Sequence, residues 1–375
     1  MSTFDSAALP ALTAQSHASN LLQLPDKTLL CAWFGGSQEG LPDIAIWLSR
    51  QAPGSDEWSA PQKIAAVDER SCQNPVLFRA PTTGDLWLFH TCQELGDQDG
   101  AVVLARTSQD GGATWGEPWQ PLTGVTGSFV RQPVVVLPDG TWLLPVFRCR
   151  QTPGYRWIGN DDISSVFYSR DEGKTWSESV VPESYGAVHM NIVAPRAGGS
   201  DYVAFYRSRW ADNVYRSTSP DGLNWTTPKP TVLPNPNSGI AAARLPSGNL
   251  VLVFNRSASS PDLAKREGLY DDITSEDDKR RNQAPIHGKS AIWGTPRKTL
   301  TVGVSSDEGL TWRERVLEDG DGFCMTNNSI EKTNRELSYP SILIEGDVAH
   351  IAFTFHRQHI KYVRIGNVEA WVDGA

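Results

Sequence analysis

The chain has 375 residues, of which 39% are hydrophobic and 21% are charged, and its formal net charge at neutral pH is −9. These proportions are typical of a globular protein with a large buried core. The acidic balance argues against nucleic acid or an anionic membrane surface as the main partner. No apolar stretch approaches the ~20 residues that a membrane-spanning helix needs, so no membrane partner is expected either.

The first 16 residues contain neither a basic segment nor a continuous apolar segment of the kind found in secretory signal peptides. The cysteines are odd in number and lack metal-ligand spacing, which favours free thiols in a reducing compartment. They are Cys31, Cys72, Cys92, Cys149 and Cys324. We therefore expect a cytoplasmic protein that uses no metal or other cofactor.

From the N-terminus onward, short apolar runs alternate with turn residues, and almost no amphipathic helix is indicated. The first unit is an apolar run at Leu21–Leu24, a turn at Pro25-Asp26-Lys27 and a second apolar run at Leu29–Trp33. The same pattern returns around residues 134–146, 241–254 and 341–355. Each unit predicts a pair of antiparallel strands joined by a tight turn.

A second pattern follows these units and has the form Ser-x-Asp-x-Gly-x-Thr-Trp. Full copies lie at 108–115, 169–176 and 305–312, a shortened copy lies at 219–225, and a faint copy lies at 55–58. Asp can accept hydrogen bonds from the amides of its own turn, Gly supplies a positive φ, and Trp packs under the hairpin. We interpret this pattern as a structural turn between the third and fourth strands of a repeat.

Together the two patterns predict four-stranded antiparallel units that begin at a regular spacing. The starts fall near His17, Asn74, Arg131, His189, Asn237 and Tyr339, and the first four are 57, 57 and 58 residues apart. Six units of this length predict an all-β fold, a six-bladed β-propeller that spans residues 1–375 as one domain. We expect the last strand, around Val368–Val372, to pair with the N-terminal blade and close the ring.

The topology also predicts which face carries the chemistry. The Asp turns and the first turn of each blade lie on one face, so the blade starts and the loops between second and third strands surround the channel mouth on the other. The fifth of these loops contains a charged insertion at about 257–295. Such a segment is either a solvated excursion, a flap over the mouth or an oligomer contact.

The repeats resemble the Asp-box (BNR) repeats of the sialidase superfamily of six-bladed propellers, over nearly the whole chain. The stretches at 33–40, 233–238 and 338–341 look like a sialidase-like branch of that superfamily. The resemblance implies a site with three arginines that hold a sugar carboxylate. It also implies a tyrosine nucleophile assisted by a glutamate, and an aspartate that acts as acid and base.

The resemblance places two of the three arginines. Arg297 matches the third, and either Arg207 or Arg209 matches the second. The position of the first is occupied by His17. A guanidinium fork suits a carboxylate, so we expect the retained arginines to bind an acidic sugar.

The catalytic positions match in part. Tyr339 corresponds to the nucleophile, and Asp43, with Glu39 as the second candidate, lies in the first mouth loop where the acid/base belongs. The activating glutamate should fall near His189, where no carboxylate exists. A tyrosine with its ordinary pKa of ~10 needs a nearby base, and His189 or His17 is the candidate.

Other polar residues are expected at the mouth. Three at blade starts suit hydroxyl or carboxylate binding: Arg131, Asn74 and Asn237. His356, Arg357 and His359 alternate on the last blade, so one is expected to face the channel.

Three functions remain open at this point. The first is an exo-acting, sialidase-like glycosidase on an acidic sugar. The second is a uronate-specific lyase, in which an arginine neutralises the carboxylate, a histidine removes a proton and Tyr339 protonates the leaving oxygen. The third is a non-catalytic glycan-binding propeller. All three imply an acidic sugar or oligosaccharide as the partner, and a homo-oligomer is compatible with each.

Overall fold

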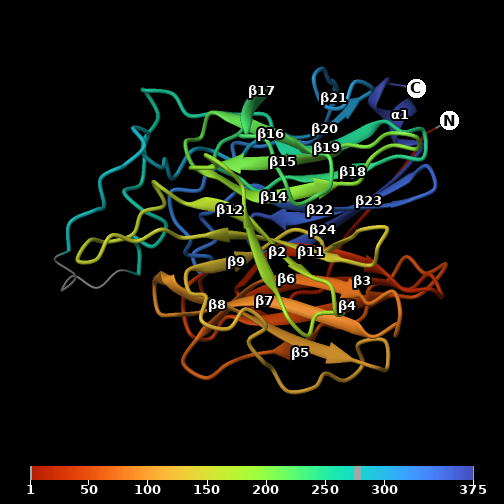
Figure 1. The fold of residues 1–375 in the computed structure, drawn as a ribbon, viewed down its shortest axis with the longest axis horizontal. Helices are drawn as coiled ribbons and strands as arrows, with labels where there is room; N and C mark the ends of the chain where they lie inside the picture. Colours follow the sequence, from red (N-terminus) through yellow and green to blue (C-terminus); the bar gives the residue numbers. More distant parts are fainter. Residues whose placement is uncertain (1, 274–279, 375) are drawn as a thin grey trace.

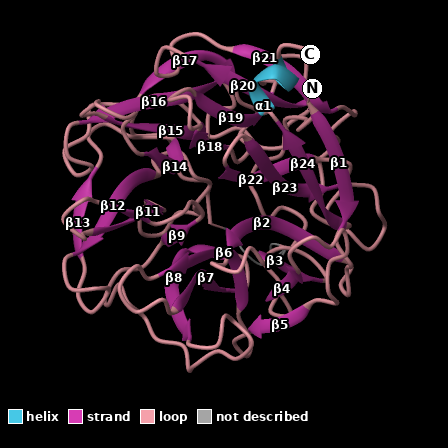
Figure 2. Cartoon of the chain, turned by 90° about the vertical axis from the view of Figure 1, so that its right-hand side faces the viewer, coloured by secondary structure: helices cyan, strands magenta, loops and turns pink. Residues whose placement is uncertain are grey.

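A computed structural model describes residues 2–273 and 280–374. Within these residues, antiparallel strands form six sheets that surround a common centre, as Figure 2 shows. The predicted all-β, six-bladed propeller is therefore confirmed. That residues 1–375 form one domain stays a prediction.

The blades follow one another along the chain. The first contains β2 (Gln15–Gln23), β3 (Leu29–Gly36), β4 (Ala45–Gln51) and β5 (Gln62–Ala65). The second contains β6 (Ser71–Arg79), β7 (Leu86–Glu94) and β8 (Asp97–Ser108). The third contains β9 (Ser128–Val130), β10 (Val135–Val136), β11 (Trp142–Arg148), β12 (Ile163–Ser169) and β13 (Ser177–Val180).

The remaining blades have four strands each. The fourth contains β14 (Ala187–Val193), β15 (Tyr202–Ser208), β16 (Asn213–Ser219) and β17 (Lys229–Pro234). The fifth contains β18 (Ala241–Arg244), β19 (Leu250–Asn255), β20 (Leu300–Ser305) and β21 (Arg313–Glu318). The sixth contains β22 (Leu337–Glu345), β23 (Val348–Phe355), β24 (His359–Gly366) and the N-terminal strand β1 (Thr3–Ala8).

The ring closes in a different way from the one predicted. β1 pairs antiparallel with β24 as the outer strand of the sixth blade, whereas Val368–Val372 is the short helix α1. The reason is local: Asn367 caps the helix, and Val368, Trp371 and Val372 bury one helical face, a spacing that a strand would split between two faces. No described helix has the length and apolar character needed to cross a bilayer.

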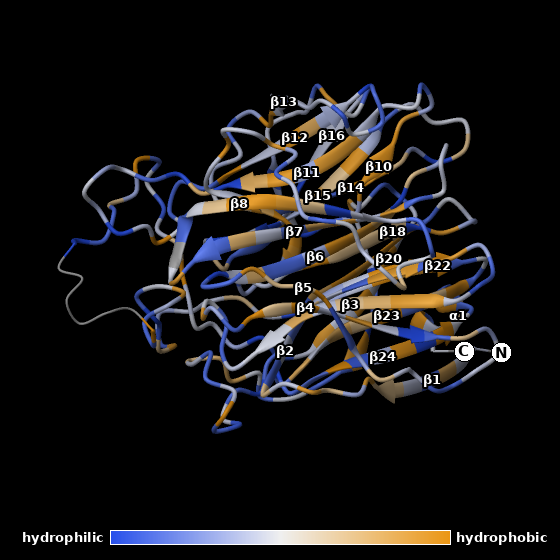
Figure 3. Cartoon of the chain, turned by 90° about the horizontal axis from the view of Figure 1, so that it is seen from below, coloured by the Kyte–Doolittle hydropathy of each residue, from blue (hydrophilic) through white to orange (hydrophobic). Residues whose placement is uncertain are grey.

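The apolar core lies where the faces of neighbouring blades meet. One buried cluster joins strands of the fifth and sixth blades, with Val251 and Val253 packed in the same group as Ile351 and Phe353. Figure 3 shows hydrophobic strands through the body, and mostly hydrophilic loops at the end that carries the insertion. The strands therefore form a rigid support for the loops at the mouth.

The Asp turns have the predicted structure. In the first copy, Asp110 accepts hydrogen bonds from the Thr114 amide at 2.9 Å and the Thr114 hydroxyl at 2.6 Å. Ser108 Oγ accepts the Gly112 amide at 2.7 Å, and Trp115 Nε1 donates to the Gly112 carbonyl at 3.1 Å. Gly112 has a φ of 84°, which favours glycine. The other copies at 169–176, 219–225 and 305–312 repeat this network.

The turn carboxylates give a testable pH dependence. Hydrogen bonds from Thr175 lower the pKa of Asp171 from 3.8 to about 2. A lowered folded-state pKa stabilises the protein above the unfolded value, and the contribution is lost as pH falls through the folded value. Asp171→Asn is therefore expected to lower the melting temperature at neutral pH, with the difference shrinking as pH falls from about 4 towards 2.

The exposed Asp262 provides a control for this experiment. Asp262→Asn removes the same charge without breaking an Asp turn and should leave the melting temperature nearly unchanged. Melting curves between pH 7 and 2 would decide. A deficit in Asp171→Asn that stays constant over this range would contradict the assignment.

The two faces of the propeller are arranged as predicted. On one face, Arg50 Nη1 of the first blade donates to the Gly111 carbonyl in the Asp turn of the second blade at 2.8 Å. Figure 1 places both termini on the side of these turns and the insertion between β19 and β20 on the opposite side. The starts of the inner strands and the long loops thus share the mouth face.

Candidate functional site

Four of the inner strands carry a bulge where they reach the mouth. In each, the first extra residue has a positive φ: Ala18, Asn74, His189 and Tyr339. Backbone strain of this kind in residues other than glycine is concentrated at functional sites. The bulges also correct the predicted blade starts, which took His17 and His189 as equivalent positions. His189 is equivalent to Ala18, and His17 lies one residue earlier in its strand.

Tyr339 lies at the centre of a group of arginines. The guanidinium carbons of Arg131, Arg207 and Arg297 lie 5.5, 5.3 and 5.5 Å from the centre of its ring. Arg207 Nη1 donates to the Tyr339 hydroxyl. Arg131 Nη2 donates to the carbonyl oxygens of Tyr339 and Pro340 at 3.0 and 2.8 Å. Arg131 therefore holds the strained backbone, whereas Arg207 contacts the Tyr339 hydroxyl.

A chain of ion pairs lies beside this group. Arg297 Nη1 is 3.0 Å from Glu336, and Arg357 lies 2.7 Å from both Glu336 and Glu39. Burial opposes ionisation of Glu336, but the charges of Arg357 and Arg297 hold its pKa below the usual value. Both arginines are thus largely neutralised by carboxylates of the chain. Arg357 is the channel-facing member of the alternating run, since it is only 1% exposed.

Arg207 is different, because no carboxylate forms an ion pair with it within the described residues. Its Nε donates to Asn237 Oδ1 at 2.6 Å, and its buried Nη2 has no hydrogen-bond partner there. Burial lowers its pKa to about 9, so it is still charged at neutral pH. A buried cation with an unused donor is a site for an anion.

Arg209 does not contact Tyr339 and pairs with another of the described residues. It lies 2.8 Å from the buried Asp162 and packs against the rings of Phe147, Trp157 and Trp293 at 5.2, 5.5 and 4.9 Å. Burial raises the pKa of Asp162 despite the neighbouring guanidinium. Of the two arginines that the sequence left open, the structure brings Arg207 to Tyr339 and pairs Arg209 with Asp162.

Two histidines flank the tyrosine. The ring centres of His17 and His189 lie 4.3 and 5.5 Å from that of Tyr339. His17 Nδ1 is 2.9 Å from the Thr354 hydroxyl. Burial and the surrounding arginines hold the pKa of both imidazoles well below the ordinary value. Both are therefore neutral at pH 7, and within the described part of the chain neither His17 Nε2 nor His189 Nδ1 has a hydrogen-bond partner.

The two candidate acids lie in different surroundings. Asp43 is exposed and accepts hydrogen bonds from the Ser37 amide and hydroxyl at 2.8 Å, so it caps its own loop. Glu39 is 4% exposed and pairs with Arg357 inside the mouth. The geometry therefore favours Glu39, the second candidate, over Asp43.

The two asparagines at blade starts also lie in the mouth. Asn237 accepts from Arg207 and donates to the Ile292 carbonyl at 2.8 Å. Asn74 is buried, and its Oδ1 has no hydrogen-bond partner among residues 2–273 and 280–374. In the same residues, no group of three or more His, Cys, Asp or Glu side chains could hold a metal ion.

Sequence reasoning missed two carboxylates of the mouth, Glu336 and Asp162. Glu336 lies only three residues before Tyr339, and this closeness in the sequence could have indicated that Glu336 also lies in the mouth. Asp162 lies in a loop with no recognisable pattern, so no signal in the sequence singled it out.

The described parts of the insertion contact neighbouring blades at the mouth, while many of their side chains, such as Asp262 and Ile286, are exposed to solvent. These contacts reach three other blades. Tyr270 bonds to Gln93 of the second blade, and Gln283 bonds to Asp161 in a loop of the third. The ring of His287 stacks on Tyr185 before the fourth blade, and Lys289 pairs with Asp212 in that blade. Most of the charge run at 276–281 lies outside the described residues. The three interpretations of the insertion, as a solvated excursion, a flap or an oligomer contact, stay predictions, and the contacts above tie its described parts to the mouth.

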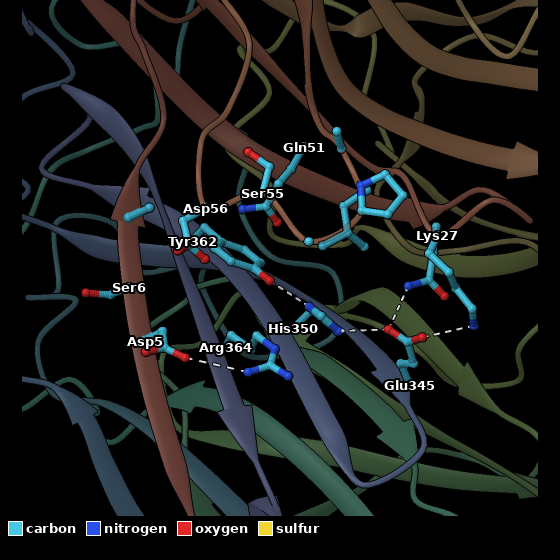
Figure 4. A pocket seen from close by; sticks show the side chains of 16 residues that line it. Asp5, Ser6, Lys27, Gln51, Ser55, Asp56, Glu345, His350, Tyr362 and Arg364 are labelled. Carbon is cyan, nitrogen blue, oxygen red and sulfur yellow. Dashed lines mark hydrogen bonds and ion pairs between the residues drawn. The ribbon is translucent and has the colours of Figure 1, made fainter.

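The cavity in Figure 4 lies away from this group of residues. It has a volume of about 660 Å³ and lies between the first and sixth blades on the face of the turns. Four of its charged side chains form ion pairs with each other, Lys27 with Glu345 at 2.9 Å and Arg364 with Asp5 at 3.6 Å. It shares no lining residue with the arginine group, so the mouth remains the candidate site.

Comparisons with known proteins agree with the repeats. A family model described as BNR repeat-like domain matches residues 27–351. Among solved structures, Hadza microbial sialidase Hz136 is 14% identical with a TM-score of 0.69, and the match covers 96% of this chain and 66% of that one. A protein of unknown function from Dyadobacter fermentans is 16% identical with a TM-score of 0.70 and coverage of 96% and 98%.

A third similar structure is the intramolecular trans-sialidase from Ruminococcus gnavus in complex with oseltamivir carboxylate. It is 11% identical with a TM-score of 0.65, and the match covers 97% of this chain and 98% of that one. None of the curated proteins matches the sequence. At these identities the structural likeness shows the fold alone. On the family match and the six blades together, the chain belongs to the BNR repeat-like domain family and is a sialidase-like propeller.

Proposed function

We propose that this protein is an exo-acting glycosidase that cleaves the bond of a terminal, carboxylate-bearing sugar at the propeller mouth. The observation that carries the proposal is Arg207, a buried cation with an unused donor beside the hydroxyl of Tyr339. A sugar carboxylate bound there would bring its anomeric carbon close to the phenol oxygen. Electrostatic stabilisation and placement of the reacting atoms are the main sources of rate enhancement in such sites.

In this reaction, Tyr339 attacks the anomeric carbon while Glu39, which must first take up a proton and weaken its ion pair with Arg357, donates that proton to the leaving oxygen. The neutral imidazole of His189 or His17 takes the phenol proton, in place of the glutamate that sialidases use. Water then attacks the glycosyl-tyrosine, with Glu39 as the base, and releases the free acidic sugar. Asp43 is less suited to act as the acid and base of this reaction, because it is exposed and bonded to Ser37.

A second candidate is β-elimination on a uronate, and the histidines are the observation that favours it. In that reaction an arginine neutralises the carboxylate, His189 removes the proton at C5, and Tyr339 gives its proton to the leaving oxygen at C4. The unpartnered Nδ1 of His189 suits this role. The products differ, because elimination leaves a 4,5-unsaturated uronate.

Product analysis on a panel of acidic glycosides tests both candidates. The panel should hold neuraminides, glucuronides and oligouronates, with free acidic sugar and the ultraviolet absorbance of the unsaturated uronate measured in parallel. We expect free sugar without a rise in absorbance. A rise would establish elimination. Binding of an acidic glycoside without any turnover would favour the non-catalytic glycan-binding propeller and contradict both enzymatic hypotheses.

A further inference from the structure

The insertion places one phenol in a polar pocket of the second blade. Tyr270 is 5% exposed, and its hydroxyl lies 3.0, 3.2 and 3.5 Å from the Nε2 atoms of Gln93, Gln98 and Gln73. Gln93 Oε1 also accepts from this hydroxyl at 3.2 Å. Three carboxamides thus converge on one oxygen atom that belongs to a loop more than 170 residues away in the sequence.

The three glutamines form a built site. They come from β6, β7 and β8, and none is more than 4% exposed. Deeper in the blade the same strands bury apolar side chains such as Val76, Phe89 and Val103. Burying a carboxamide is costly unless it is hydrogen-bonded, so three together need a polar partner.

The pocket contains hydrogen-bond acceptors that have no partner among the described residues. In the described part of the chain, Gln73 Oε1 is buried and has no hydrogen-bond partner, and the same holds for Oδ1 of the adjacent Asn74. Asn74 occupies the bulge equivalent to that of Tyr339. The pocket therefore has spare acceptors on the side of the mouth.

The pocket also adjoins the loop of the proposed acid. A Cβ on Gly40 would lie 2.7 Å from Tyr270 Cε1, so the ring packs directly against this loop. Burial and the nearby Glu39 carboxylate raise the pKa of Tyr270, so its hydroxyl stays neutral. A group in this pocket would therefore lie beside the loop that carries Glu39.

We propose that Gln73, Gln93 and Gln98 form a subsite for an uncharged, hydroxyl-bearing group of the ligand, which Tyr270 fills when no ligand is bound. A carboxamide offers both donors and acceptors, as a hydroxyl requires. The Glu39 carboxylate disfavours an anion there, and the uncharged carboxamides match an uncharged group that both donates and accepts hydrogen bonds. The inference deepens the proposed function and rests on it, since the ligand is taken to be the acidic sugar bound at Arg207.

Binding of small probes tests the subsite without any turnover. We expect p-cresol to bind Tyr270→Ala at least about tenfold more tightly than the unaltered protein, because the pocket is then empty. We also expect methyl galactoside, a neutral sugar, to displace p-cresol in saturation-transfer NMR. Gln93→Leu in the Tyr270→Ala background should abolish both effects. Tyr155→Phe, at an exposed tyrosine of a neighbouring loop, is the matched control and should change neither.

The outcomes distinguish a ligand-binding subsite from a packing site that only holds Tyr270 of the insertion in place. Binding of p-cresol without displacement by the sugar would overturn the proposal, and so would the absence of any binding to a folded Tyr270→Ala. If that variant does not fold, Tyr270→Phe replaces it and must bind methyl galactoside more tightly than the unaltered protein. These binding results do not depend on activity, so an inactive protein would refute the proposed function and leave the subsite standing.

Discussion

Tyr339→Phe is expected to lower turnover of an acidic glycoside by at least about 10²–10⁴-fold, the range that a positioned proton-transfer group contributes. The hydroxyl is the nucleophile in hydrolysis and the proton donor in elimination, so both reactions need it. The ring would stay between Arg131 and Arg297, and the carboxylate site at Arg207 would stay charged. We therefore expect the loss in kcat, with substrate affinity changed much less.

Tyr206→Phe is a matched control for this variant. Its hydroxyl is also buried and lies 2.7 Å from Ser217 Oγ, but inside the fourth blade. Removing it should affect stability and leave kcat nearly unchanged. Steady-state kinetics of both variants, with melting curves to establish folding, decide the matter. If Tyr339→Phe kept activity within a few-fold of the unaltered protein, Tyr339 would be a packing residue in both reactions.

The fold could be predicted because its main signals are local. An Asp turn such as 169–176 makes its hydrogen bonds within eight residues, so the pattern of residue types is enough to recognise it. Ring closure was predicted wrongly because it depends on which end of the chain reaches β24. The sequence at Val368–Val372 is apolar enough for a strand, and only its packing shows that one face is buried.

The candidate site could be predicted only in part, because its pairings are long-range. The structure brings the expected Tyr339, Arg207 and Arg297 together, and their roles stay predictions. Arg207 and Arg209 are two residues apart, and only the fold decides which one meets Asp162. The expected equivalence of His17 and His189 is wrong by one residue, because the bulge position with a positive φ is Ala18 in β2 and His189 in β14. Bulges have no signature in the sequence here, and a shift of one residue changes which side chain faces the channel.

Arg207→Lys is expected to lower kcat/KM on an acidic substrate by about one to two orders of magnitude. Lysine keeps the charge but loses the planar fork that contacts Asn237, the Tyr339 hydroxyl and, in the proposal, the substrate carboxylate. One charge-assisted hydrogen bond contributes roughly 1.5–3 kcal/mol, and about 1.4 kcal/mol corresponds to a factor of ten. Turnover of a neutral analogue should fall less, since the contacts to Asn237 and Tyr339 are lost with both substrates and only the acidic one also loses the bond to its carboxylate.

Arg244→Lys provides the control, because Arg244 also binds a carboxylate with two nitrogens, Glu308 at 3.0 and 2.8 Å, but does so outside the mouth. It should leave both activities unchanged. Arg297 is less suited to the test, since its fork already holds Glu336 and a lysine there would disturb the ion pairs with Arg357. Equal losses on charged and neutral substrates in Arg207→Lys would mean that Arg207 only supports Tyr339. In that case the carboxylate site, on which hydrolysis and elimination both depend, would have to lie elsewhere in the mouth.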